Sequence, residues 1–103
     1  METPKLKLKN KTYTAQRPTM GVWRQVVEYD ETKKDGLIEA VDGHMKILSV
    51  IYDIPVDKIQ ENIDIADIIP SYIEAATWVI NLTYEKMKAI PKNAEAGQDK
   101  EQN

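Results

Sequence analysis

The sequence predicts an α+β domain that is mostly α-helical, with an N-terminal β-hairpin followed by three to four helices. At the start of the chain, apolar residues alternate with lysines, and this period of two is typical of a strand with one buried face. After residue 19, apolar residues recur every three or four positions, which is the spacing of an amphipathic helix. With 103 residues, the chain is long enough for one core and too short for two ordinary domains. We therefore expect a flexible N-terminus over residues 1–4, a single domain over 5–90 and a disordered polar tail over 91–103.

The hairpin is predicted from the alternation of Leu6 and Leu8 with lysines, followed by a second polar and apolar alternation. We place a two-residue turn at Asn10 and Lys11, because asparagine tolerates a positive φ. This register puts the apolar pairs on one face of the ribbon. An isolated hairpin is marginal in water, so that face is expected to pack on the helices. The expected pairs are Lys9 with Thr12, Leu8 with Tyr13 and Leu6 with Ala15.

Segments of helical periodicity follow the hairpin. Thr19 has the side chain of an N-cap for the first of them. Gly43 lies inside the second and costs about 1 kcal/mol relative to alanine, which indicates either close packing there or a shorter helix. In the last segment, Asp67 as the N-cap places Pro70 in the first turn, whereas Asp64 as the N-cap predicts a kink at the proline. The expected helices span about residues 20–32, 37–52, 56–61 and 64 or 67 to 89.

The last predicted helix carries two apolar stripes, which is more than one small core covers. A monomer rarely leaves a large apolar patch in water, so we expect the second stripe to lie against a partner or a second copy of the chain. Tryptophan is enriched at binding hot spots, which favours Trp78 as an anchor and Trp23 as the fallback if Trp78 is buried. The main stripe is Ile69, Ile73, Ala76, Ile80 and Met87, and the second stripe is Ala75, Trp78, Val79 and Leu82. The candidate partner-binding residues are Trp78, Leu82, Ala75, Val79 and Trp23.

Signs of catalysis are sparse in this sequence. Acidic residues outnumber basic residues by 17 to 14, for a net charge of −3, which argues against nucleic acid as the main partner. The chain has no cysteine, and its one histidine, His44, has no ligand or base one turn away on its helix. The acids of residues 53–67 lack the spacing of a calcium-binding loop and suit helix caps and first turns. We therefore predict no catalytic residue, no cofactor, no metal site and no enzyme activity.

The chain shows no signal for a membrane or for secretion. No apolar run approaches the roughly 18–20 residues that a membrane helix needs. The first residues also lack the apolar core of a signal peptide. We expect a cytoplasmic protein with no membrane partner.

The order of the segments is distinctive. The lysine-rich hairpin of residues 6–15 (LKLKNKTYTA) is followed by residues 22–29 (VWRQVVEY) and by a helix that ends in residues 50–52 (VIY). Residues 56–59 (VDKI) and 62–70 (NIDIADIIP) then lead into the last helix. Over roughly residues 5–90, this pattern resembles the tail assembly chaperones of long-tailed (siphovirus-type) phages and prophages of Gram-positive bacteria. The chain departs from the family at Lys11, where such hairpins often turn with glycine.

The resemblance implies a function that the composition alone does not give. Members of the family are non-catalytic, bind the long apolar tape measure protein, keep it soluble and help recruit tail tube subunits around it. The implied partners are thus the tape measure protein and the tail tube protein, in the bacterial host cytoplasm, and the chain is expected to be absent from the mature virion. Many members are also made in a longer, frameshifted form, and the polar tail would suit such a junction.

Two other functions fit the same residues. One is a small virion structural protein, such as a head–tail connector or a tail completion component, that stays in the particle. The other is a regulator or adaptor that binds one bacterial protein. Neither has a motif of its own in this sequence.

Overall fold

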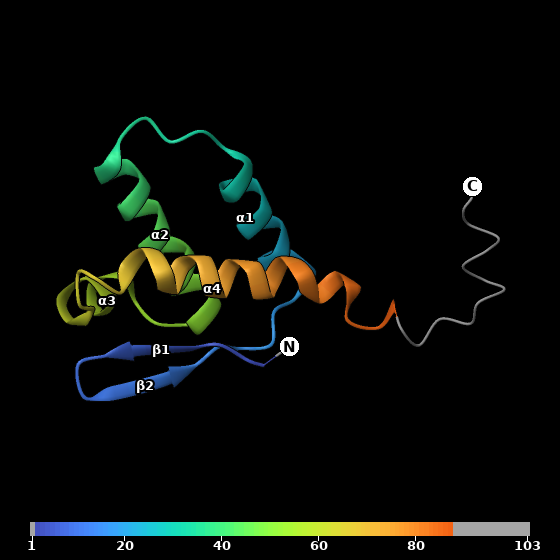
Figure 1. The fold of residues 1–103 in the computed structure, drawn as a ribbon, viewed down its shortest axis with the longest axis horizontal. Coiled ribbons are helices and arrows are strands. Elements are labelled where there is room, and N and C mark those ends of the chain that lie inside the picture. The colour runs from blue at the N-terminus through green and yellow to red at the C-terminus, as the bar shows by residue number, and fades with distance from the viewer. Residues whose placement is uncertain (1, 88–103) are drawn as a thin grey trace, which may run out of the picture.

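An antiparallel β-hairpin and four α-helices make up residues 2–87, the part of the chain that the structure, a computed structural model, describes (Figure 1). The predicted class, α+β and mostly α, is confirmed. The tail predicted for residues 91–103 lies outside the described residues. The elements are β1 (Lys5–Leu8), β2 (Lys11–Thr14), α1 (Met20–Glu31), α2 (Leu37–Tyr52), α3 (Val56–Asn62), α4 (Ile68–Asn81) and a 3₁₀ turn at Leu82–Tyr84.

The predicted register of the hairpin is wrong, because the turn lies one residue earlier than expected. The turn falls at Lys9 and Asn10, with the positive φ of 52° at Lys9. Leu6 therefore pairs with Tyr13, and Leu8 pairs with Lys11. The expected and observed partners of each residue differ by two positions, so both leucines still face the core, where their side chains are 0% and 3% exposed.

Contacts around β2 support this register. The Tyr13 ring lies beneath two ammonium groups, those of Lys11 and Lys58, at 5.2 and 5.3 Å from the ring centroid. Ala15 donates its amide to the Pro4 carbonyl at 3.1 Å, which continues the same register one pair beyond the strands. Of these contacts, the one with Lys58 comes from α3, so the local turn preference of asparagine carries no sign of it.

The ends of the helices follow the capping residues. The Thr19 hydroxyl accepts a hydrogen bond from the Val22 amide at 3.4 Å, as predicted for an N-cap. Asp67 is the N-cap residue of α4, so Pro70 lies in the first turn, where its missing amide costs nothing. Asp53 ends α2 in the left-handed conformation, with φ 57°.

The fourth helix ends earlier than predicted. We expected it to reach about residue 89, but α4 ends at Asn81. The carbonyl of Ile80 accepts hydrogen bonds from the Trp23 indole at 3.3 Å and from the Thr83 hydroxyl at 3.1 Å. Beyond this carbonyl the chain tightens into the 3₁₀ turn at Leu82–Tyr84.

The core lies where α4 crosses α1 and α2, with the hairpin alongside (Figure 1). Each of the strand β1 and the four helices contributes a side chain that is at most 1% exposed. α1 and α2 diverge from this crossing towards the loop that joins them (Figure 1). The largest fully buried side chains are Leu6, Leu48, Ile51, Ile59, Val26 and Val79.

Candidate partner-binding groove

The α4 stripe that we expected to lack cover lies in the core. Trp78 is 4% exposed, and Ala75 and Val79 are fully buried. α4 packs against both α1 and α2, so this stripe and the neighbouring Tyr72 and Ala76 are covered within the single chain. The expectation of an uncovered face at these residues is wrong.

Trp23 and Leu82 are the two predicted anchors that remain partly accessible. Both are half-buried, and both line a shallow hollow of about 160 Å³ where α1 begins and α4 ends. The Trp23 indole is held by its hydrogen bond to the Ile80 carbonyl. Met20, 62% exposed, lies at the edge of the same hollow. Whether Trp23 and Leu82 bind a partner stays a prediction.

Other exposed apolar side chains lie around the start of α4 and at the start of α2. On α4 and just before it, Ile65, Ile69 and Ile73 follow each other at a spacing of one turn, and each is exposed. Ile69 and Ile73 belong to the main stripe, which we expected in the core; of that stripe, Ala76 is buried and Ile80 is half-buried. At the start of α2, Leu37 and Ile38 are 71% and 79% exposed.

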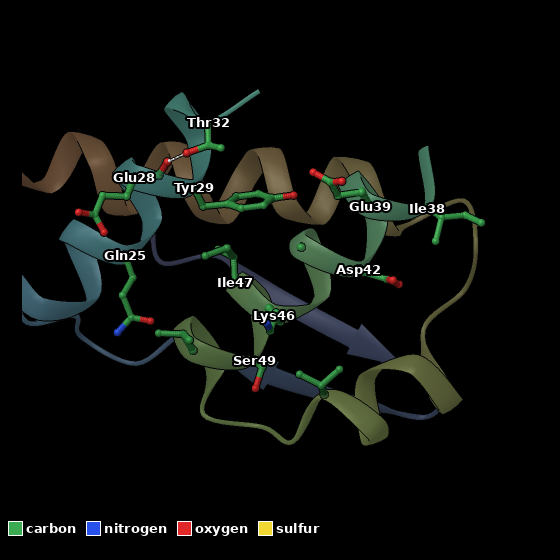
Figure 2. Close-up of a pocket in the computed structure, with 13 residues that line it drawn as sticks. Gln25, Glu28, Tyr29, Thr32, Ile38, Glu39, Asp42, Lys46, Ile47 and Ser49 are labelled. Carbon is green, nitrogen blue, oxygen red and sulfur yellow. Dashed lines mark hydrogen bonds between the residues drawn. The ribbon is translucent and has the colours of Figure 1, made fainter. Parts of the chain in front are cut away.

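An open groove lies between α1 and α2, with α3 at one end (Figure 2). Its volume is about 970 Å³. Figure 2 shows the Tyr29 ring reaching from α1 towards α2, and Ile47 reaching from α2 towards α1. With Ile38, Val50 and Val56, these side chains give the groove an apolar lining.

Gly43 allows the two walls of the groove to meet. A Cβ atom at this position would overlap with the ring and hydroxyl of Tyr29. The absence of a side chain therefore lets Tyr29 lie directly on the backbone of α2. Close packing, one of the two explanations for a glycine inside this helix, is confirmed.

The Tyr29 hydroxyl is fixed by two partners on α2. It lies 2.7 Å from the Ala40 carbonyl oxygen and 2.8 Å from Nδ1 of His44. A carbonyl only accepts, so the single hydroxyl proton is donated to Ala40, and His44 Nδ1–H donates to the tyrosine oxygen. This assigns the Nδ1–H tautomer to neutral His44.

Aromatic packing joins this pair to α4. The imidazole of His44 stacks on the Tyr72 ring, with centroids 4.0 Å apart, and Tyr29 meets both rings edge-on. The Tyr72 hydroxyl donates to Asp30 at 2.9 Å, and the Lys34 ammonium lies 4.0 Å from the Tyr29 centroid. Burial and the neighbouring Asp30 carboxylate raise the pKa of Tyr72. The cluster fixes α1, α2 and α4 behind the groove.

The stability of the fold should fall as the pH is lowered through the range where histidine titrates. Burial, and then the Lys34 charge, lower the pKa of His44 below its ordinary value, while Asp30 opposes them. Below about pH 6.5 the unfolded chain therefore binds more protons than the folded one, and protonation favours unfolding. Urea unfolding at pH 7.5 and at pH 5.5 would measure this difference. Since His44 is the one histidine in the chain, His44→Asn should remove most of it. An unchanged pH dependence in that variant would contradict the assignment.

The groove shows no arrangement typical of a metal site. Among residues 2–87, no group of three or more histidines, cysteines or acidic residues is placed to hold a metal ion. The Thr32 and Ser49 hydroxyls that line the groove donate to nearby backbone carbonyls. Thr32 donates to Glu28 at 2.6 Å and Ser49 to Ile54 at 2.5 Å. Within the same residues, no helix is long and apolar enough to cross a membrane.

Comparisons with family models, with curated proteins and with solved structures gave no match. The resemblance to tail assembly chaperones therefore rests on the order and pattern of the segments. The groove was not predicted from the sequence, because its walls come from helices whose relative placement is set by α4. Its one local signal was the glycine inside the second helix.

Proposed function

We propose that this chain is a non-catalytic tail assembly chaperone that holds an apolar helical segment of a tape measure protein in the groove between α1 and α2. The observation that carries the proposal is the groove itself, which has an apolar lining and is open to solvent along its length. Apolar grooves of this kind bind one face of an amphipathic helix. The segment order that resembles the chaperone family supports the same function.

The dimensions of the groove suit a helical partner. Its lining on α2 extends from Ile38 to Val50. At 1.5 Å per residue, this length is about 18 Å, or roughly three helical turns. A bound helix of that length presents apolar residues at positions i, i+3 or i+4, and i+7. These would contact Tyr29 and Ile47 at the centre of the groove.

Holding such a segment would keep a tape measure protein soluble. A long helical protein with exposed apolar seams aggregates through the same hydrophobic force that drives folding. The bound chain, which has a net charge of −3, would add a polar surface to the complex. A second apolar surface, Ile65, Ile69 and Ile73, lies on residues that do not line the groove. It would remain free to contact a tail tube subunit.

Co-expression with the tape measure protein of the same phage or prophage tests the proposal. The wild-type chain should raise the soluble fraction of that protein and co-purify with it. Ile38→Asp places a charge in the groove and should weaken binding about tenfold or more. Leu37→Asp is the matched control, since Leu37 is similarly exposed in the same helical turn and does not line the groove. It should bind as the wild type does.

A wild-type chain that neither binds nor solubilises the tape measure protein would refute the proposal. Mass spectrometry of purified virions then separates it from the alternative. A chaperone of the host cytoplasm is missing from the particle, whereas a head–tail connector or tail completion component is present in it.

A further inference from the structure

We infer that the helix bound in the groove carries lysine or arginine residues along the borders of its apolar stripe. The inference rests on the proposed function of the groove and names the chemistry of its partner. The edges of the groove carry carboxylates on both walls, Glu28 on α1 and Glu39 and Asp42 on α2. Lys46 is the single cationic residue among those that line it.

None of these carboxylates forms an ion pair within the described residues. Among residues 2–87, the one ion pair joins Arg17 to Glu85, away from the groove. Glu28, Glu39 and Asp42 are all exposed. In Figure 2, the carboxylates of Glu28 and Glu39 lie to either side of the Tyr29 ring. The apolar centre is thus bordered by negative charge that a basic partner would neutralise.

Charge complementarity of this kind selects between helices that have the same apolar stripe. Lysines at the borders of the bound helix would meet two or three carboxylates, whereas glutamates would meet like charge. Each exposed ion pair contributes little, so the selectivity comes from the set and weakens with salt. Lys46 would favour one acidic or polar residue near the middle of the partner.

Two labelled helical peptides serve as probes. They share one leucine stripe at positions i, i+3, i+4 and i+7, and the residues that border it are lysine in one peptide and glutamate in the other. Fluorescence anisotropy measures the binding of each to the full chain. We expect the lysine peptide to bind about tenfold more tightly at about 0.05 M salt, and the preference to shrink at about 0.5 M salt, where charges are screened over a shorter distance.

Charge reversal on the two walls supplies the decisive variant. Glu28→Lys/Asp42→Lys should abolish the preference for the lysine peptide or reverse it. Glu39 is left unchanged because its carboxylate lies in the first turn of α2, where its negative charge stabilises the helix. Glu2→Lys/Glu74→Lys changes the net charge equally at exposed residues outside the groove, and it should keep the wild-type preference.

The outcomes separate this inference from the proposed function. Equal binding of both peptides to the wild type would overturn the basic partner and leave a helix-binding groove. A preference that the outside variant loses as fully as the groove variant would also overturn it, because net charge alone would then explain the selectivity. Binding of neither peptide would refute both the inference and the groove as a helix site.

Discussion

Replacing Trp78 with alanine should lower the free energy of unfolding by about 3–5 kcal/mol, the usual cost of removing a buried tryptophan. The side chain is 4% exposed and belongs to the core that joins α4 to the rest of the domain. A domain of this size has about 5–15 kcal/mol of stability in all, so the loss is a large part of the total. At about 4–8 °C per kcal/mol, the melting temperature should fall by at least about 12 °C.

Thermal melting followed by circular dichroism measures this effect, and Ile73→Ala provides the matched control. Ile73 is on the same helix but 56% exposed, so its truncation should change stability by no more than about 0.5 kcal/mol. If Trp78 were a surface anchor, the two variants would melt alike. That result would contradict the packing of α4 described above.

Gly43→Ala should destabilise the fold by about 1–3 kcal/mol, although alanine is the better helix former. The new methyl group would overlap with the Tyr29 ring. The ring has little freedom to move, because its hydroxyl bonds Ala40 and His44 and its edge packs on Tyr72. Moving it would break a hydrogen bond worth about 1 kcal/mol and disturb the wall of the groove.

Urea unfolding of two further variants tests the cause. Gly21→Ala is the matched control in α1, where the nearest atom to the new Cβ is the Thr19 hydroxyl oxygen at 3.6 Å, an ordinary contact. It should stabilise the protein by up to about 1 kcal/mol. In a Tyr29→Ala background, Gly43→Ala should likewise become neutral or stabilising. A Gly43→Ala penalty that persists without the Tyr29 ring would show that the overlap is not its source.

Much of the fold could be predicted because the signals are local. Thr19 caps α1, and the bounds of α2 follow from apolar periodicity between Gly36 and Asp53. The register of the hairpin could not be predicted in the same way. Two turns one residue apart keep the same leucines on the core face, and the contact of Tyr13 with Lys58, from a distant helix, is not visible in the local pattern.

The candidate site was less accessible to sequence reasoning. Both stripes of α4 are apolar, and periodicity does not tell which of them faces α1 and α2. Trp78 lies in the core and Ile73 in solvent because of how α4 crosses its neighbours. Predicting the groove likewise requires the angle between α1 and α2. Gly43 indicates where the two helices come close, but it does not give that angle.

The hydrogen bonds of Tyr29 also bear on the order in which the chain folds. They join residues that are 11 and 15 positions apart, whereas the bonds from Tyr72 to Asp30 and from Trp23 to Ile80 span 42 and 57 positions. The entropy lost in closing a loop grows with its length, so the α1–α2 pair should assemble before α4 docks on it. Changes at Gly43 should then slow folding, while changes at Trp78 should mainly speed unfolding.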